Sequence, residues 1–203
     1  MFFVMSALFV RAELPLISDV SHQPAWAELF AQLAPSRSRY STFEERQFFS
    51  FRKEPVVLTG EIRIVPGQGL SLRYLTPEPR LMIADGKGIL LRDGQGRERV
   101  PPSDDRTQLA MGALVSVLRF NLPELEKVFE VRGERTGKTW ELAFVPRDAS
   151  LAATFGTLTL SGEETRPRKI EIQRSATQRI EIVLGEPQDG VIFTGEVLKR
   201  FFR

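Results

Sequence analysis

From Tyr40 onward the sequence alternates apolar and polar side chains, and turn residues interrupt this pattern every eight to twelve positions. In residues 57–65 (VLTGEIRIV), every second residue from Leu58 to Ile64 belongs to one face, and Thr, Glu and Arg occupy the other. The same alternation marks Leu70–Tyr74, Thr139–Val145, Gly156–Leu160, Lys169–Gln173 and Arg179–Leu184. Strands with one apolar and one polar face are typical of antiparallel sheets, so the pattern predicts a sandwich or a barrel.

Glycines indicate where the predicted sheet bends and turns. Gly60 lies inside a predicted strand, where glycine permits a bulge or a sharp bend. Asp85-Gly86 and Asp93-Gly94 flank a short apolar stretch, and both dipeptides favour tight hairpin turns. We therefore expect a curling sheet with short connections in this part of the chain.

Three segments have a helical pattern instead. Pro24–Leu33 carries its large apolar residues at three- and four-residue spacing, and Pro35 ends it. Gln108–Phe120 is apolar around most of its circumference, and a shorter helical piece runs from Pro123 to near Phe129. A helix of the Gln108–Phe120 kind is either a core helix that plugs the sheet or a helix that contacts a hydrophobic ligand. Ser103-Asp104-Asp105 stands just before it, where N-caps and acidic first-turn residues belong, and cation binding is the alternative.

The first residues form a separate segment. Phe2–Val10 is a nearly unbroken apolar run followed by Arg11 and Ala12, which is the pattern of a secretory signal peptide without its basic start. The run is shorter than the roughly 20 residues of a membrane-spanning helix. We expect residues 1–12 to be a signal peptide and residues 22–203 to form one domain; an apolar helix packed on that domain is the alternative.

Composition excludes most enzyme classes. The 203 residues contain no cysteine and a single histidine, His22, so thiol chemistry, disulfides and multi-histidine metal sites are excluded. A net charge of +2 argues against nucleic-acid binding. The chain lacks a Gly-x-Ser-x-Gly motif and a complete phosphate-binding glycine loop. Glu44 and Glu45 are neighbours on a strand and point to opposite faces. We predict no catalytic residue, no metal and no cofactor.

Several short motifs occur in an order that is typical of one family. They are Tyr40–Gln47, Pro55 and Gly60, Val65-Pro66-Gly67 through Leu72-Arg73-Tyr74 to Pro77, Asp85-Gly86, Leu125–Phe129, Trp140–Pro146 and Gly156–Gly162. In this order the chain resembles the periplasmic lipoprotein carriers, the LolA-type proteins. It is more similar to a divergent LolA-like branch found with aryl-polyene and related lipid biosynthesis genes. The resemblance spans roughly residues 24 to 194.

The resemblance implies a mainly β, α+β fold, an incomplete antiparallel β-barrel of about eleven strands with helices covering the open side. It also implies a hydrophobic cavity that takes an acylated lipoprotein from an inner-membrane transporter and passes it to an outer-membrane acceptor. The family carries an arginine before the turn proline, where it hydrogen-bonds to the lid; here that position is Val65. Either closure uses another contact, or the protein does not open and close in the same manner.

The predicted function is therefore a periplasmic, monomeric carrier of acyl chains in the Gram-negative envelope. An envelope sensor or assembly module that binds acylated or unfolded proteins on the same sheet is the second hypothesis, and an enzyme acting on a lipid precursor is the third. Each predicted cavity residue has an ordinary core role as its alternative. The predicted lining is Phe43, Ile62, Ile64, Leu72, Tyr74, Trp140, Leu142 and Phe144 from the sheet, with Met111, Leu114, Val115 and Leu118 from the helix.

Overall fold

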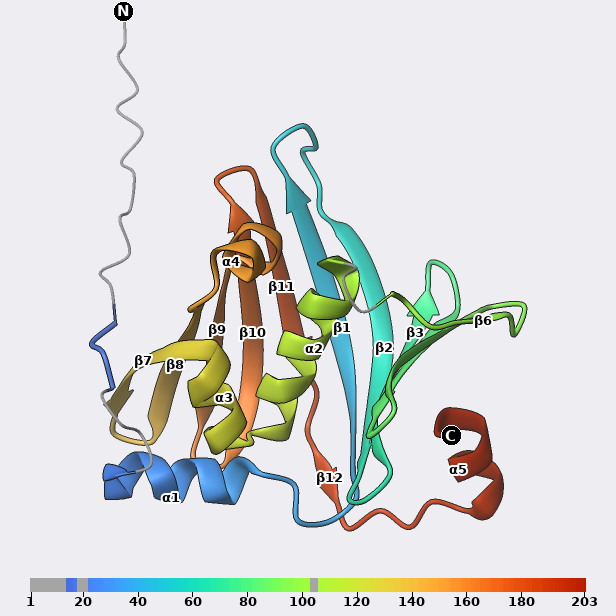
Figure 1. Cartoon of the computed structure of the whole chain (residues 1–203), viewed down its shortest axis with the longest axis horizontal. Coiled ribbons are helices and arrows are strands. Elements are labelled where there is room, and N and C mark those ends of the chain that lie inside the picture. The colour runs from blue at the N-terminus through green and yellow to red at the C-terminus, as the bar shows by residue number, and fades with distance from the viewer. Residues whose placement is uncertain (1–13, 18–21, 103–105) are drawn as a thin grey trace, which may run out of the picture.

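The computed structural model describes residues 14–17, 22–102 and 106–203, with the backbone alone for 106–110. In this part of the chain, twelve strands form one sheet (Figure 1). The strands are β1 (Arg39–Phe49), β2 (Val56–Val65), β3 (Gly69–Thr76), β4 (Arg80–Asp85), β5 (Gly88–Asp93), β6 (Glu98–Arg99), β7 (Phe129–Thr136), β8 (Thr139–Pro146), β9 (Thr157–Glu163), β10 (Arg166–Ser175), β11 (Gln178–Leu184) and β12 (Gln188–Asp189). The predicted signal peptide and the predicted caps Asp104 and Asp105 lie outside the described residues.

The strands pair in the order β6-β5-β4-β3-β2-β1-β11-β10-β9-β8-β7, and β12 pairs with β1. All of these pairs are antiparallel. The edge strands β6 and β7 do not join, so the strongly curved sheet is a barrel left open on one side (Figure 1). The predicted fold class, an incomplete antiparallel barrel with covering helices, is confirmed.

Gly60 lets β2 pass close to a large side chain of the neighbouring strand. The β2–β3 register shifts between Thr59 and Gly60, as the strand glycine predicted. A Cβ atom at Gly60 would lie 2.4 Å from the Phe43 ring, so only glycine leaves room for this ring over the neighbouring strand. The predicted turn at Asp85-Gly86 is also present, because Asp85 pairs with Gly88 across the β4–β5 hairpin.

Helices cover both faces of the sheet. They are α1 (Pro24–Leu33), α2 (Arg106–Arg119), α3 (Leu122–Val128), α4 (Ala149–Phe155) and α5 (Gly195–Phe201). α2, α3 and α4 lie within the curve of the sheet, and α1 closes one end (Figure 1). In the described part of the chain, no helix is both long enough and apolar enough to cross a membrane.

Strand alternation divides the core into two clusters. Met82 and Ala84 of β4 belong to the large concave cluster, together with α1–α4. Leu81 and Ile83 of the same strand belong to a small convex cluster, which α5 covers with Phe201 and Phe202. The sequence analysis predicted neither α4 nor α5. Residues 14–17 pair with the free edge of β7, where the amide of Ile17 donates to Val131 O at 3.0 Å.

Candidate functional site

Helix α2 lies over the concave face and is buried unevenly. Val115, Val117 and Leu118 are buried against the sheet and its neighbouring helices, whereas Met111 and Leu114 are half-buried at the rim of the core. α2 lies closest to α3, α4 and β5, and Leu118 and Arg119 near its C-terminal end also reach β2 and β4. The apolar segment predicted at Gln108–Phe120 is therefore a helix with one packed face and one partly open face.

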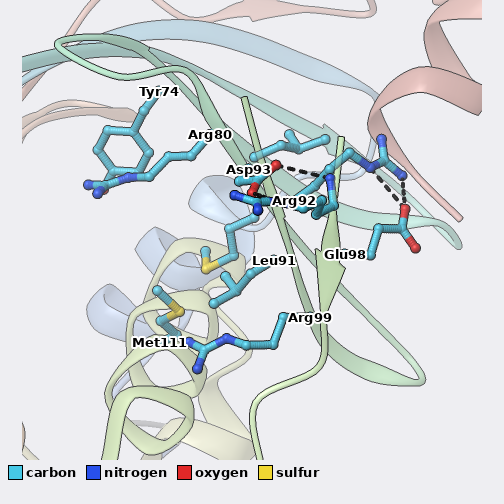
Figure 2. Close-up of a pocket in the computed structure, with 11 residues that line it drawn as sticks. Tyr74, Arg80, Leu91, Arg92, Asp93, Glu98, Arg99 and Met111 are labelled. Atoms are coloured by element: carbon cyan, nitrogen blue, oxygen red, sulfur yellow. Dashed lines mark hydrogen bonds and ion pairs between the residues drawn. The ribbon is translucent and has the colours of Figure 1, made fainter. Parts of the chain in front are cut away.

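Two pockets open along the partly open face, and Met111 lines both of them. The arginine pocket has a volume of about 440 Å³. Its lining is Tyr74, Arg80, Leu81, Met82, Leu91, Arg92, Asp93, Arg97, Glu98, Arg99 and Met111 (Figure 2). The α4 pocket, of about 570 Å³, lies at β10 and β11. Its lining is Met111, Leu114, Ala153, Thr154, Phe155, Ile172, Arg174, Ser175, Gln178 and Ile180. Both volumes lie in the range of small-molecule sites, about 300–1,000 Å³.

A third, much smaller pocket lies beneath the other end of α2. Its volume is about 40 Å³, and Ile62, Ile64 and Leu118 line it together with Leu184. This space is close to the size of a single water molecule. The helix thus packs closely on β2 at this point. A pocket of about 340 Å³ borders the same end, where Ile64, Arg119 and Asn121 are among its lining residues, and the two larger pockets lie at the Met111 end.

The predicted cavity residues separate into three groups. Six line the pockets around α2, namely Tyr74, Met111 and Leu114 at the two large ones and Ile62, Ile64 and Leu118 at the small one. Five are buried in the concave cluster: Phe43, Leu72, Val115, Leu142 and Phe144. Trp140 is also buried, borders a polar surface pocket on β8 and β9, and donates from its indole N–H to Glu164 O at 2.8 Å. Ligand binding by these residues stays a prediction.

The cross-strand register explains why the arginine pocket has both apolar and basic walls. Met82, Leu91 and Arg99 stand opposite one another across β4, β5 and β6. Residues directly opposite in an antiparallel pair point to the same face. Arg99 is therefore carried to the concave face, beside Met111 (Figure 2).

A second row brings Tyr74 and Arg80 together at the same pocket. They stand opposite each other on β3 and β4, and the Arg80 guanidinium lies over the Tyr74 ring, 4.1 Å from its centroid (Figure 2). The pocket's two carboxylates are engaged by its other two arginines. Asp93 accepts from Arg97 Nε at 2.7 Å, and Glu98 accepts from Arg92 Nη2 at 2.6 Å. Among the described residues, no carboxylate forms an ion pair with Arg80 or Arg99.

Glu45 is a buried carboxylate that the sequence analysis did not select. It is 4% exposed and accepts hydrogen bonds from the Tyr74 hydroxyl at 2.8 Å and from Gln47 Nε2 at 2.6 Å. Burial raises the pKa of Tyr74 above its ordinary value, and the adjacent Glu45 charge raises it further. Glu45 is in phase with Phe43 on β1, which is the signal that could have found it. Glu44 points to the other face and accepts from Arg46, so the two neighbours separate as predicted.

The C-terminal end of α2 is anchored. Arg119 donates from Nη2 to Ala84 O on β4 at 3.0 Å. Phe120 ends the helix with φ at +52° and packs edge-on against Phe30 of α1, with ring centroids 6.3 Å apart. Val65 packs on the other side of the sheet, against the convex cluster of α5. The hydrogen bond between helix and sheet is therefore donated by an arginine of the helix, Arg119, and the sheet position discussed above, Val65, takes no part in it.

The described residues hold no group of three or more His, Asp or Glu side chains placed to bind a metal ion. What the concave side offers chemically is apolar surface, two open pockets and guanidinium groups at one of them. Such a site binds and orients an amphiphile by burial and charge.

The sequence matches the model of one known protein family. The family described as outer membrane lipoprotein carrier protein LolA-like matches residues 26–191. The chain belongs to this family of LolA-like carriers. No curated protein matches the sequence.

Solved structures with low sequence identity are similar to the chain. A LolA superfamily protein from Nitrosomonas europaea has 9% identity and a TM-score of 0.49, covering 87% of this chain and 97% of that one. A putative outer membrane lipoprotein-sorting protein domain from Vibrio parahaemolyticus has 10% identity and a TM-score of 0.46, over 86% and 94% of the two chains. The MucA/MucB complex of Pseudomonas aeruginosa has 17% identity and a TM-score of 0.47, over 88% and 60%.

Proposed function

We propose that this protein is a non-enzymatic periplasmic carrier that binds the acyl chains of a lipoprotein or lipid on the concave face and moves them from the inner toward the outer membrane. An inner-membrane transporter and an outer-membrane acceptor would be its partners. Membership in the LolA-like family supports the class of cargo. The association with aryl-polyene and related lipid biosynthesis stays a prediction.

The observation that carries the proposal is the pair of pockets that meet at Met111. The arginine pocket and the α4 pocket flank the same half-buried side chain on α2. A small displacement of this part of the helix would join them into one apolar groove. Methionine suits such a position because its flexible, polarizable side chain adapts to ligands of different shape.

Burial alone supplies enough binding energy for such cargo. Each methylene removed from water contributes about 0.8 kcal/mol, so ten buried methylenes contribute roughly 8 kcal/mol before the costs of association. No catalytic group is needed. Release is the harder step, and it requires that protein surface replace the ligand.

Helix α2 has the contacts expected of a cover that moves at one end. Arg119 and Phe120 fix its C-terminal end to β4 and α1. The Met111 end lies between two open pockets instead of a packed wall. We infer that acyl chains enter at the Met111 end, and that α2 covers the apolar surface again when the ligand leaves.

The test is mass spectrometry of organic extracts from the protein purified out of a bacterial envelope without detergent. The expected result is a stoichiometric acyl lipid or lipopeptide. A Leu114→Asp variant should lose it, because a charge at the α4 pocket opposes an acyl chain. Val183→Asp is the matched control, since Val183 is 44% exposed on a strand and should tolerate the change with the lipid retained.

A protein that carries no lipid and fails to bind a fluorescent hydrophobic probe would contradict the proposal. Helix α2 would then be a plug of the core, and the sheet would be better regarded as a surface for acylated or unfolded proteins. Retention of the lipid by Leu114→Asp, with an unchanged circular dichroism spectrum, would contradict the assignment of the α4 pocket alone.

A further inference from the structure

The arginine pocket has more positive charge than its own carboxylates match. Four arginines and two carboxylates line it. The carboxylates are held by Arg97 and Arg92, at 2.7 Å and 2.6 Å. Arg80 and Arg99 are left facing the pocket from the concave side, as the cross-strand rows with Tyr74 and Leu91 require.

The apolar floor of this pocket lies directly beside these two guanidinium groups. Met82 is buried, Leu91 and Met111 are half-buried, and all three line the pocket. Arg80 lies against Tyr74 at one side, and Arg99 lies beside Met111 at the other (Figure 2). Arg80 and Arg99 are exposed residues at the rim, so their charge stays in contact with water, whereas the floor residues are buried or half-buried.

We propose that the arginine pocket selects amphiphiles with an anionic head group, a carboxylate or a phosphate, over neutral ones. Arg80 and Arg99 bind the head group at the rim, and the acyl chain lies on Met82, Leu91 and Met111. Guanidinium suits both anions because its planar N–H donors match two oxygens at once. This inference rests on the proposed carrier function and narrows its cargo.

The neighbouring groups support anion binding at these two arginines in particular. Asp93 stands opposite Arg80, but its oxygens accept from the amides of Gln95 and Arg97, both at 2.9 Å, and from the Arg97 side chain. These hydrogen bonds hold the pKa of the Asp93 carboxyl below its usual range. Its negative charge therefore interacts mainly with groups of its own turn. Tyr74 is oriented by its bond to Glu45, so its ring is a fixed support for the Arg80 guanidinium.

Three ligands of equal chain length test the inference on the full chain: dodecanoate, monododecyl phosphate and methyl dodecanoate. Displacement of a fluorescent hydrophobic probe gives the Kd of each. We expect at least one anion to bind about tenfold more tightly than the ester, the factor typical of one hydrogen bond to a charged group. The tighter of the two anions identifies the head group. Added salt should reduce the preference, because the rim is exposed.

Two double variants distinguish the effect of the arginine charges on ligand binding from the effect of packing. Arg80→Gln/Arg99→Gln should bring the anions to the affinity of the ester and leave the ester unchanged. Arg52→Gln/Lys53→Gln removes the same charge from the exposed β1–β2 connection and should keep the preference. Equal binding of all three ligands by the unchanged protein overturns the inference and leaves the carrier proposal standing. Binding of none of them overturns both.

Discussion

Helices α2 and α5 cover opposite faces of the same sheet in different ways. α5 packs Phe201 onto the buried Arg63, whose guanidinium carbon lies 4.0 Å from the ring centroid. Its end is also held by Arg92, which donates to Arg200 O at 2.8 Å, and by the Arg203–Asp85 ion pair at 2.8 Å. α2 is anchored at one end by Arg119 and leaves two pockets at the other.

The difference indicates which cover is structural and which is exchangeable. Removing α5 would expose the convex cluster and take the Phe201 ring from Arg63. It would also break the bonds of Arg92 and Arg203 that hold the chain end, whereas none of the pockets described above borders α5. Moving the Met111 end of α2 exposes apolar surface that a ligand can cover in its place. The same sheet can thus keep one face closed and use the other for binding.

The largest expected effect concerns the buried core of the concave cluster, to which Leu142 of β8 belongs. Leu142 is fully buried, so Leu142→Ala should lower the free energy of unfolding by about 3 kcal/mol through lost burial and a cavity. Leu114→Ala, on the half-buried face of α2, should cost under about 1 kcal/mol. Urea denaturation followed by circular dichroism measures both. Equal costs would mean that α2 is as much a part of the core as β8, and the contrast with α5 would fail.

Phe201→Ala tests the convex side. Phe201 is 6% exposed, and its loss should lower the free energy of unfolding by roughly 2–3 kcal/mol, because the small convex cluster opens and Arg63 loses the nearer of its two aromatic rings. Dodecanoate binding to this variant should stay unchanged at temperatures where it is folded. A loss of binding would show that the two faces are coupled and would contradict their division of roles.

Much of this architecture could be predicted from the sequence, because its signals are local. The bounds of α1 match the prediction, since proline starts the helix and a second proline follows its end. Alternation located most strands, and Asp85-Gly86 located a hairpin. The sequence analysis did not predict α5, because its seven residues give a short and mixed pattern. Its burial also depends on the face of the sheet that the alternation had predicted to be polar.

The basic side of the site could not be predicted, because it depends on register. Arg80 and Arg99 lie 19 positions apart, and pairing with Tyr74 and Leu91 brings them to one pocket. Glu45 was considered only with Glu44, as strand neighbours that point to opposite faces, although its phase with Phe43 places it inside. The predicted lining treated the concave face as one cavity, whereas the open volume lies to either side of α2.

The smallest expected effect concerns the ion pair that holds the chain end after α5. The hydrogen bond from Arg203 is the main cause that lowers the pKa of Asp85 from its ordinary value of 3.8. A lowered carboxyl pKa stabilises the fold fully above that value, and this contribution is lost as the pH falls through the lower pKa of the folded state. Arg203→Gln should therefore reduce the free energy of unfolding at pH 7 by about 1 kcal/mol, because Asp85 loses one hydrogen-bonded partner and keeps the amide of Lys87. As the pH is lowered through the folded-state pKa of Asp85, the two urea midpoints should converge. A difference that persists there would mean that Arg203 acts through its bond to Gly88 O, at 3.1 Å, and that α5 is held by the backbone contact instead of the charge.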